Sequence, residues 1–154
     1  MKSNLYKNIL IATDGSNYSA KTVEHGIEIA KLLGSRVFTV YVVDTGAFAS
    51  IPMDMAWENI YEMLRSEGKK ATDFVKEKGQ KEDVEVECII IDGHPAEEIV
   101  NFSENNSIDL IIMGTLGKSG LDRFLLGSIA EKVLRNAKVP VMIIRSEKQD
   151  KSTS

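Results

Sequence analysis

Cysteine is nearly absent from this sequence, with Cys88 the only one in 154 residues. A single thiol cannot form an intramolecular disulfide, and it excludes a zinc site built from several cysteines. Cys88 lies in the apolar run of residues 86–91, which predicts a strand. We therefore expect a thiol packed within a sheet rather than a reactive one.

Long apolar runs and an excess of positive charge are missing as well. No segment reaches the roughly 20 apolar residues of a membrane-spanning helix, and the short apolar run near the N-terminus ends at Asp14, unlike a signal peptide. The formal net charge is −4 and the pI is about 5.3, so we expect no general attraction to nucleic acid or to anionic membranes. These features predict a cytoplasmic protein without membrane or nucleic-acid partners.

What the sequence does contain is an alternation of short β-branched runs with longer helical periods. Apolar runs predict strands at residues 8–12, 37–43, 84–91, 110–113 and 139–144. Helical spacing and end signals predict helices at residues 20–33, 57–79, 95–105 and 128–136. Residues 45–56 are expected to form a long loop. Residues 1–146 are expected to form one domain, followed by a polar, disordered tail at 147–154.

This alternation is typical of an α/β fold in which helices cover both faces of a parallel sheet. Right-handed crossovers leave few arrangements. We predict a single-domain three-layer sandwich of the flavodoxin or adenine nucleotide α-hydrolase kind, with strand order 3-2-1-4-5. In that order a crevice opens beyond the carboxyl ends of strands 1 and 4. Ala12, Thr13 and Asp14 end the first of these strands, and Met113 and Gly114 end the other.

A glycine-rich stretch follows the fourth predicted strand, at residues 114–120. Its glycines allow backbone N–H groups to approach an anion closely. Farther along, Ser128 and Glu131 have the spacing of a capping box, which predicts Ser128 as the N-cap of the last helix. A helix N-terminus attracts phosphate, so the loop and the helix start together predict a polyphosphate site.

Several familiar nucleotide motifs do not fit this stretch. Gly117, Lys118 and Ser119 look like the end of a Walker A loop, but that loop needs a glycine where Ile112 stands. The dinucleotide fingerprint is missing too, because the turn after the first strand holds only Gly15. That turn also lacks the Ser-Gly-Gly pattern of pyrophosphatase-type ATP loops.

The spacing of the glycines resembles the ATP-binding motif of the universal stress protein family. Two residues separate Gly114 from Gly117, and nine separate Gly117 from the pair Gly127 and Ser128. Further stretches resemble the same family in the same order, at residues 9–16, 41–44, 93–99, 109–114 and 139–141, so that the resemblance covers about residues 7–145.

The resemblance implies a role for particular residues and a bound ATP, often with Mg²⁺ or Mn²⁺. It implies that Asp14, with Ala12 and Thr13, contacts the sugar and that the backbone of Val42 reads the adenine. The remaining implied residues lie at or near the phosphates, with Lys118 and Ser119 as neighbours inside the loop: Met113, Gly114, Gly117, Lys118, Ser119, Gly127, Ser128 and Ile129. The family also implies a homodimer through the last strand, from Val139 to Ile144, which should lie at a sheet edge.

The residues leave the catalytic question open. Asp14 precedes Gly15, and such a pair also forms turns without any ligand. The sequence shows no nucleophile–base pair and no cluster of metal ligands. We therefore expect a nucleotide-dependent regulatory or stress-response module with at most slow ATP hydrolysis. The alternatives are a genuine ATPase or nucleotidyl-transfer enzyme of the same fold, or a structural partner protein without a ligand.

Overall fold

The computed structural model describes residues 2–48, 50, 52, 55–115 and 126–145. The predicted tail at 147–154 lies outside these residues, as do Gly117, Lys118 and Ser119 of the glycine-rich stretch.

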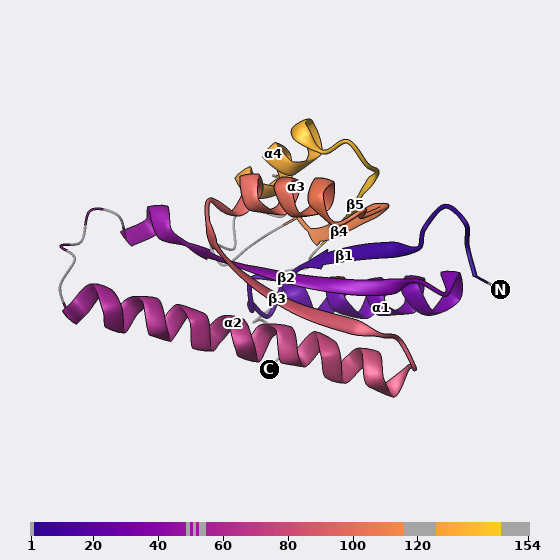
Figure 1. Ribbon diagram of the computed structural model, residues 1–154, viewed down its shortest axis with the longest axis horizontal. Coiled ribbons are helices and arrows are strands. Elements are labelled where there is room, and N and C mark those ends of the chain that lie inside the picture. Colours follow the sequence, from indigo (N-terminus) through magenta and orange to yellow (C-terminus); the bar gives the residue numbers. More distant parts are fainter. Residues whose placement is uncertain (1, 49, 51, 53–54, 116–125, 146–154) are drawn as a thin grey trace, which may run out of the picture.

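A five-stranded sheet forms the centre of the molecule (Figure 1), and its neighbouring strands are all parallel. Its order is β3-β2-β1-β4-β5, which confirms the predicted order. The strands are β1 (Asn8–Ala12), β2 (Arg36–Asp44), β3 (Val86–Gly93), β4 (Leu110–Gly114) and β5 (Val141–Ile144). In the register, β1 stops early: Ala12 pairs with Val40, whereas β2 continues to Asp44 beside β3. This difference in length leaves part of β2 without a neighbour on the β1 side.

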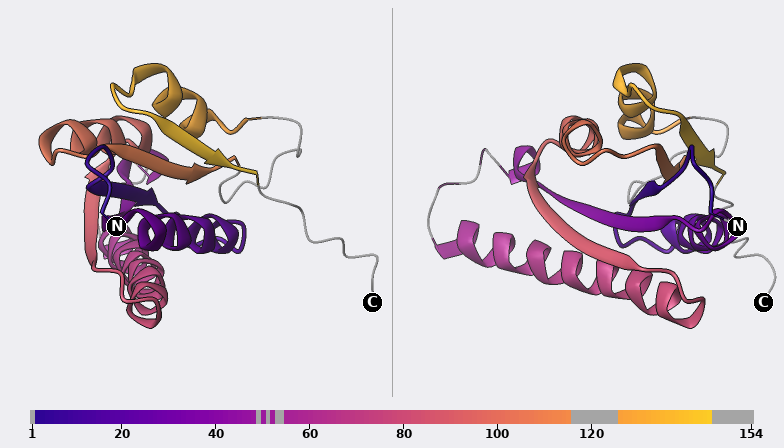
Figure 2. Two further views of the ribbon diagram at one scale, coloured as in Figure 1. Left: turned by 90° about the vertical axis from the view of Figure 1, so that its right-hand side faces the viewer. Right: turned by 45° about the vertical axis from the view of Figure 1, so that its right-hand side comes forward.

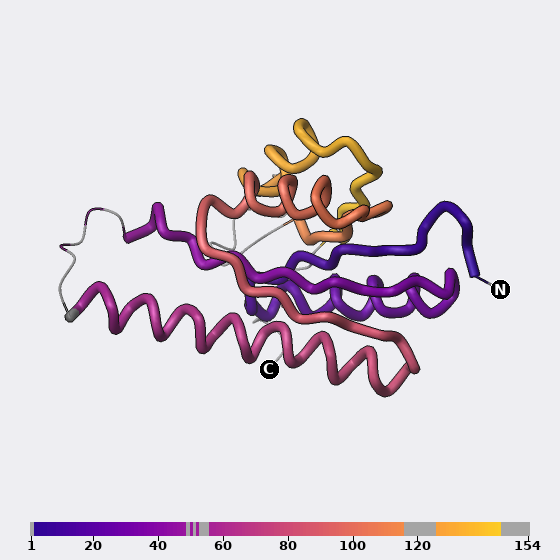
Figure 3. Tube along the Cα trace, in the orientation of Figure 1, coloured from indigo at the N-terminus to yellow at the C-terminus, as the bar shows by residue number. Residues whose placement is uncertain are grey.

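Helices cover both faces of the sheet, which confirms the three-layer sandwich (Figure 2). The elements are α1 (Ser19–Leu33), the 3-10 helix η1 (Thr45–Phe48), α2 (Met55–Lys81), α3 (Pro95–Asn105) and α4 (Ser128–Asn136). Helices α1 and α2 lie on one face, with α2 running along β2 and β3 (Figure 3). Helices α3 and α4 lie on the other. None of the helices in the described ranges is long and apolar enough to cross a membrane.

Alternation along β1 explains why residues 9–12 of this central strand are all apolar. Ile9 and Ile11 point into the core under α1, where Val23 and Ile27 meet them. Leu10, between them, points into the opposite core under α3 and α4. Because a central parallel strand is buried on both faces, its apolar residues follow one another without a polar alternation, and this run was recognisable from the sequence.

The predicted loop at residues 45–56 is partly wrong. Thr45–Phe48 form η1, and α2 already begins at Met55. Phe48 is only 3% exposed, and its ring packs edge-on against Trp57 at 5.2 Å between centroids. Phe48 and Trp57 stand before and after the link between η1 and α2. The turn-forming composition of that link therefore did not reveal their contact.

Cys88 lies in β3 as predicted, although it is half-buried rather than fully enclosed. Its thiol donates a hydrogen bond to the backbone oxygen of Thr72 in α2, at 3.3 Å. Burial raises the pKa of the Cys88 thiol, which favours the unreactive protonated form at neutral pH.

Candidate functional site

A cavity of about 430 Å³ opens at the carboxyl ends of β1, β2 and β4. Its volume lies in the range of small-molecule sites, and its position is the crevice predicted from the strand order. Every predicted site residue that the structure describes lines it: Ala12, Thr13, Asp14, Val42, Met113, Gly114, Gly127, Ser128 and Ile129. Gly117, Lys118 and Ser119 cannot be placed, since they lie outside the described residues.

Asp14 follows β1 in a tight turn that leads into α1. Its Oδ1 accepts a hydrogen bond from the N–H of Ser16 at 2.9 Å, and the N–H of Gly15 donates to Thr13 Oγ1 at 3.3 Å. Gly15 has a φ of +77°, which favours glycine at this position. Asp14 is therefore a turn former and a wall of the cavity at once, so the two sequence interpretations of Asp14 are compatible.

The backbone of Val42 faces the cavity because β1 has already ended. The carbonyl of Val40 accepts a hydrogen bond from the N–H of Thr13 at 3.0 Å, so the polar backbone groups of Val40 point toward β1. Alternate residues of a strand orient these groups alike, and Val42 therefore points the same way. Ala12, the last residue of β1, pairs with Val40, so the N–H and carbonyl of Val42 extend beyond the strand. Half-buried backbone groups in this position need a partner.

Gly127 holds the start of α4 against the end of β4. Its N–H donates to the carbonyl oxygen of Thr115 at 2.8 Å. A Cβ added to Gly127 would lie 2.9 Å from that same oxygen, closer than side-chain carbons come to backbone oxygens. Gly127 therefore allows two backbone segments to touch, and this contact brings the start of α4 to the end of β4.

The predicted N-cap of α4 is wrong by one residue. Gly127 has extended dihedral angles and is the N-cap, and Ser128 is the first helical residue. No side chain caps the helix, so the predicted capping box between Ser128 and Glu131 does not form. The N–H of Glu131 instead donates to the carbonyl of Gly127 at 2.9 Å. The first N–H groups of an α-helix have no partner within the helix, and here they belong to residues that line the cavity.

The sequence reasoning missed several lining residues. They come from α1, β2, η1, α2, α3, the residue after β4 and α4: Ser19, Val40, Tyr41, Asp44, Ala47, Leu64, Pro95, Ile99, Thr115 and Ala130. Asp44 had a usable signal, because it stands two residues after Val42 and so shares its face of β2. Ala47 and Leu64 had none, since only the tertiary packing of η1 and α2 brings them to the cavity.

The described lining carries no positive side chain. Its charged members are two carboxylates, Asp14 and Asp44, and the described residues contain no group of three or more His, Cys, Asp or Glu that could hold a metal. An anionic ligand at this lining would therefore rely on backbone N–H groups and on a cation that it brings with it.

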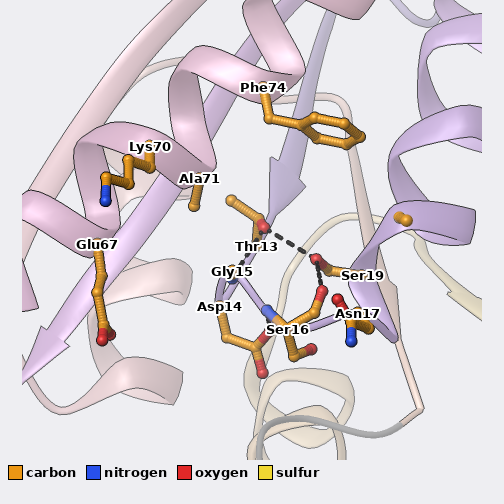
Figure 4. Close-up of a pocket in the computed structure, with 11 residues that line it drawn as sticks. Thr13, Asp14, Gly15, Ser16, Asn17, Ser19, Glu67, Lys70, Ala71 and Phe74 are labelled. Atoms are coloured by element: carbon orange, nitrogen blue, oxygen red, sulfur yellow. Dashed lines mark hydrogen bonds between the residues drawn. The ribbon is translucent and has the colours of Figure 1, made fainter.

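A second cavity, of about 590 Å³, lies on the other side of the same turn, against α2 (Figure 4). It shares Thr13, Asp14 and Ser19 with the first cavity. In this shared wall, Thr13 Oγ1 donates to Ser19 Oγ at 3.3 Å, and Ser19 Oγ donates to the carbonyl of Ser16 at 2.6 Å. Apart from Thr13 and Asp14, no described residue of the predicted site lines the second cavity, so the predicted residues converge on the first.

The sequence matches known proteins over nearly its whole length. The sequence profile of the Universal stress protein family matches residues 5–145. The chain is 44% identical to Universal stress protein MJ0531 of Methanocaldococcus jannaschii over 147 residues, covering 96% of this chain and 86% of that protein.

Solved structures give the same result for the fold. The structure of MJ0577 from M. jannaschii is 30% identical, with a TM-score of 0.82, and the match covers 94% of this chain and 99% of that chain. A universal stress protein from Archaeoglobus fulgidus, solved in complex with dAMP, is 24% identical with a TM-score of 0.65. That match covers 91% of this chain and 98% of that chain, and at this identity it shows the fold alone.

Proposed function

The chain belongs to the universal stress protein family, and on that premise we propose that it binds ATP in the cavity between β1, β2, β4 and α4. In this proposal, the bound nucleotide controls a regulatory or stress-response module. The observation that carries it is the convergence on one cavity of all the predicted site residues that the structure describes. The dAMP complex of the A. fulgidus protein supports it, since a protein of this fold holds an adenine nucleotide.

The base and the sugar would occupy the end of the cavity near β2. The Val42 backbone groups that extend past β1 suit the edge of an adenine ring, because they offer one donor and one acceptor. The cavity lining also includes the apolar side chains of Ala47, Leu64 and Ile99. Asp14, in the next turn, would accept hydrogen bonds from sugar hydroxyls.

The phosphates would lie at the end of the cavity formed by Gly114, Gly127 and Ser128. The uncapped N-terminus of α4 offers N–H groups and a partial positive charge to them. We expect Mg²⁺ or Mn²⁺ to accompany ATP, held mainly by phosphate oxygens, because Mg²⁺ needs only one or two protein carboxylates. Within the described lining, such an ion would supply the positive charge that the side chains do not.

Substitution of Ser128 by proline tests the phosphate contact without disturbing the helix. Ser128 is the first residue of α4 and follows Gly127 at φ −61° and ψ 152°. Proline is well tolerated in the first helical position and after an extended residue. Ser128→Pro therefore removes one N–H that α4 does not use. We expect ATP–Mg²⁺ to bind to Ser128→Pro about tenfold more weakly in calorimetry, with the melting temperature of the free protein nearly unchanged.

Ser128→Ala is the matched control, because it removes the hydroxyl and keeps the N–H. We expect Ser128→Ala to bind ATP more tightly than Ser128→Pro does. Equal affinity of the wild type and Ser128→Pro would contradict the phosphate assignment, and no binding of ATP by the wild type would contradict the proposed function. Single-turnover hydrolysis faster than about 0.1 per second, and so close to the typical enzyme range of about 1 to 1000 per second, would favour the alternative of a genuine ATPase.

A further inference from the structure

Asp44 is one of the two carboxylates in the described lining of the cavity. It ends β2, and its side chain lies on the same face of that strand as Val40 and Val42, because side chains alternate along a strand. Both valines belong to the core under α3 and α4. Asp44 thus places a carboxylate after the apolar side chains of Val40 and Val42, at the half-buried end of β2.

The neighbouring backbone fixes the position of this carboxylate. Asp44 Oδ1 accepts a hydrogen bond from the N–H of Gly46, at the start of η1, at 3.1 Å. A Cβ added to Gly46 would lie 3.3 Å from that oxygen and 3.2 Å from Cε1 of His94, which precedes α3. The carboxylate is therefore held close to η1 and α3. The described structure gives its second oxygen, Oδ2, no hydrogen-bond partner.

A carboxylate in this position distinguishes two kinds of purine. An ionised carboxylate only accepts hydrogen bonds. The 6-amino group of adenine donates hydrogen bonds, whereas the 6-oxo group of guanine or hypoxanthine accepts them. With the ring-nitrogen edge of the base at the Val42 backbone, a 6-oxo group facing Asp44 would set two acceptors against each other in a half-buried place, and an unsatisfied polar group there is unfavourable.

We infer that Asp44 selects the base of the bound nucleotide, favouring 6-amino purines over 6-oxo purines. The inference rests on the proposed nucleotide site and adds a determinant of specificity to it. The Val42 backbone contributes one donor and one acceptor, and it lies two residues, about 6.6 Å, along the same strand. The backbone of Val42 offers the same donor and acceptor whatever its side chain is. At this edge of the proposed site, the side chain of Asp44 is therefore the group that a change of sequence can alter.

The test compares ATP with ITP, which differ only in the 6-position and the adjacent ring nitrogen of the base. We expect the wild type to bind ATP at least about tenfold more tightly than ITP, measured by calorimetry with Mg²⁺. Asp44→Asn keeps an oxygen for the N–H of Gly46 and adds an amide donor. That amide can serve the 6-position of either purine, so the ratio should fall about threefold or more from its wild-type value, and the discrimination that remains is that of the Val42 backbone.

Asp92→Asn is the matched control. Asp92 lies near the end of β3, paired with Val43, and it accepts a hydrogen bond from the hydroxyl of Tyr61 at 2.6 Å rather than lining the cavity. We expect this variant to keep the wild-type ratio. A purely structural role of Asp44 would change the melting temperature and leave the ratio unchanged, and that result would overturn the inference. Equal binding of ATP and ITP by the wild type would overturn the inference about Asp44 but leave the proposed function standing. A wild type that binds neither nucleotide would overturn both.

Discussion

At the scale of single residues, Gly127 has a role in the fold that its sequence motif did not indicate. The sequence places it in a phosphate-binding motif, where the absence of a side chain leaves room for a ligand. The structure adds that the space is already needed by the chain itself, because the backbone of Gly127 rests on the carbonyl of Thr115. A contact between residues 115 and 127 depends on the path of the intervening chain, which local sequence does not specify.

This contact predicts that Gly127 matters for stability even without nucleotide. Gly127→Val would place a Cβ 2.9 Å from the Thr115 oxygen, so the two segments must separate. We expect the free energy of unfolding to fall by about 1–3 kcal/mol, as for other overpacked sites, measured by urea denaturation of the nucleotide-free protein.

Leu126→Ala provides the comparison for Gly127→Val. Leu126 is the neighbouring residue and is 37% exposed, so its truncation should change stability by less than about 0.5 kcal/mol. An unchanged urea midpoint for Gly127→Val would mean that the contact with Thr115 adds nothing to stability. Because Gly127→Val is expected to disturb the fold, a loss of its ATP affinity would not report on phosphate binding alone. Ser128→Pro is therefore the better probe of the proposed phosphate site.

At the scale of elements, the strands were predictable and the connections were not. Apolar runs located β1 and β4 to within a residue, because central parallel strands are buried on both faces. The end of α1 was also predictable, since Gly34 has a φ of +67° and caps the helix. In contrast, η1 depends on the packing of Phe48 against Trp57, which comes from a different element.

The packing of η1 predicts that Phe48→Ala destabilises the protein and weakens the cavity. Phe48 is 3% exposed and meets the face of α2 that carries Trp57. Truncation of a buried phenylalanine costs about 3–5 kcal/mol. Because Ala47 lies beside it in the cavity wall, ATP affinity should fall too. Trp57 is the only tryptophan, so its fluorescence reports directly on this contact.

Phe74→Ala serves as the reference for this change. Phe74 also comes from α2, but it is 39% exposed and lines the second cavity. Its truncation should have a smaller effect on stability and leave the fluorescence of Trp57 nearly unchanged. If the two variants lost equal stability, η1 would not be anchored by Phe48 in the way that we describe.

At the scale of the whole molecule, the position of the cavity could be predicted from topology alone. Once the strand order 3-2-1-4-5 was predicted, the crevice beyond β1 and β4 was fixed, and Asp14 and Gly114 both line the cavity there. The closure of that crevice by Leu64 of α2 and Ala47 of η1 could not be predicted. It depends on where α2 crosses the sheet, and amphipathic spacing shows which face of a helix is buried but not what lies opposite.

The sheet also predicts how two copies of the protein associate. β5 is an edge strand. The carbonyls of Pro140, just before β5, and of Ile144, at its end, turn toward β4 and accept hydrogen bonds from the N–H groups of Ile111 and Thr115. By alternation, Val141 and Ile143 turn their backbone groups outward, where a second copy of β5 can pair with them. We predict a homodimer through this edge, and light scattering should give twice the 17.1 kDa mass of one chain.

Met142 is the residue through which this dimer can be tested. Its side chain is 37% exposed on β5, and a two-fold axis across the strand would bring both copies of it close together. Met142→Lys would place like charges there, which natural edge strands use to prevent pairing, so we expect a monomer at micromolar concentration. Met63→Lys, at a 54% exposed methionine of α2, should remain a dimer. A monomeric wild type would contradict the prediction of a homodimer. A dimeric Met142→Lys would show that the interface lies on a surface other than the β5 edge.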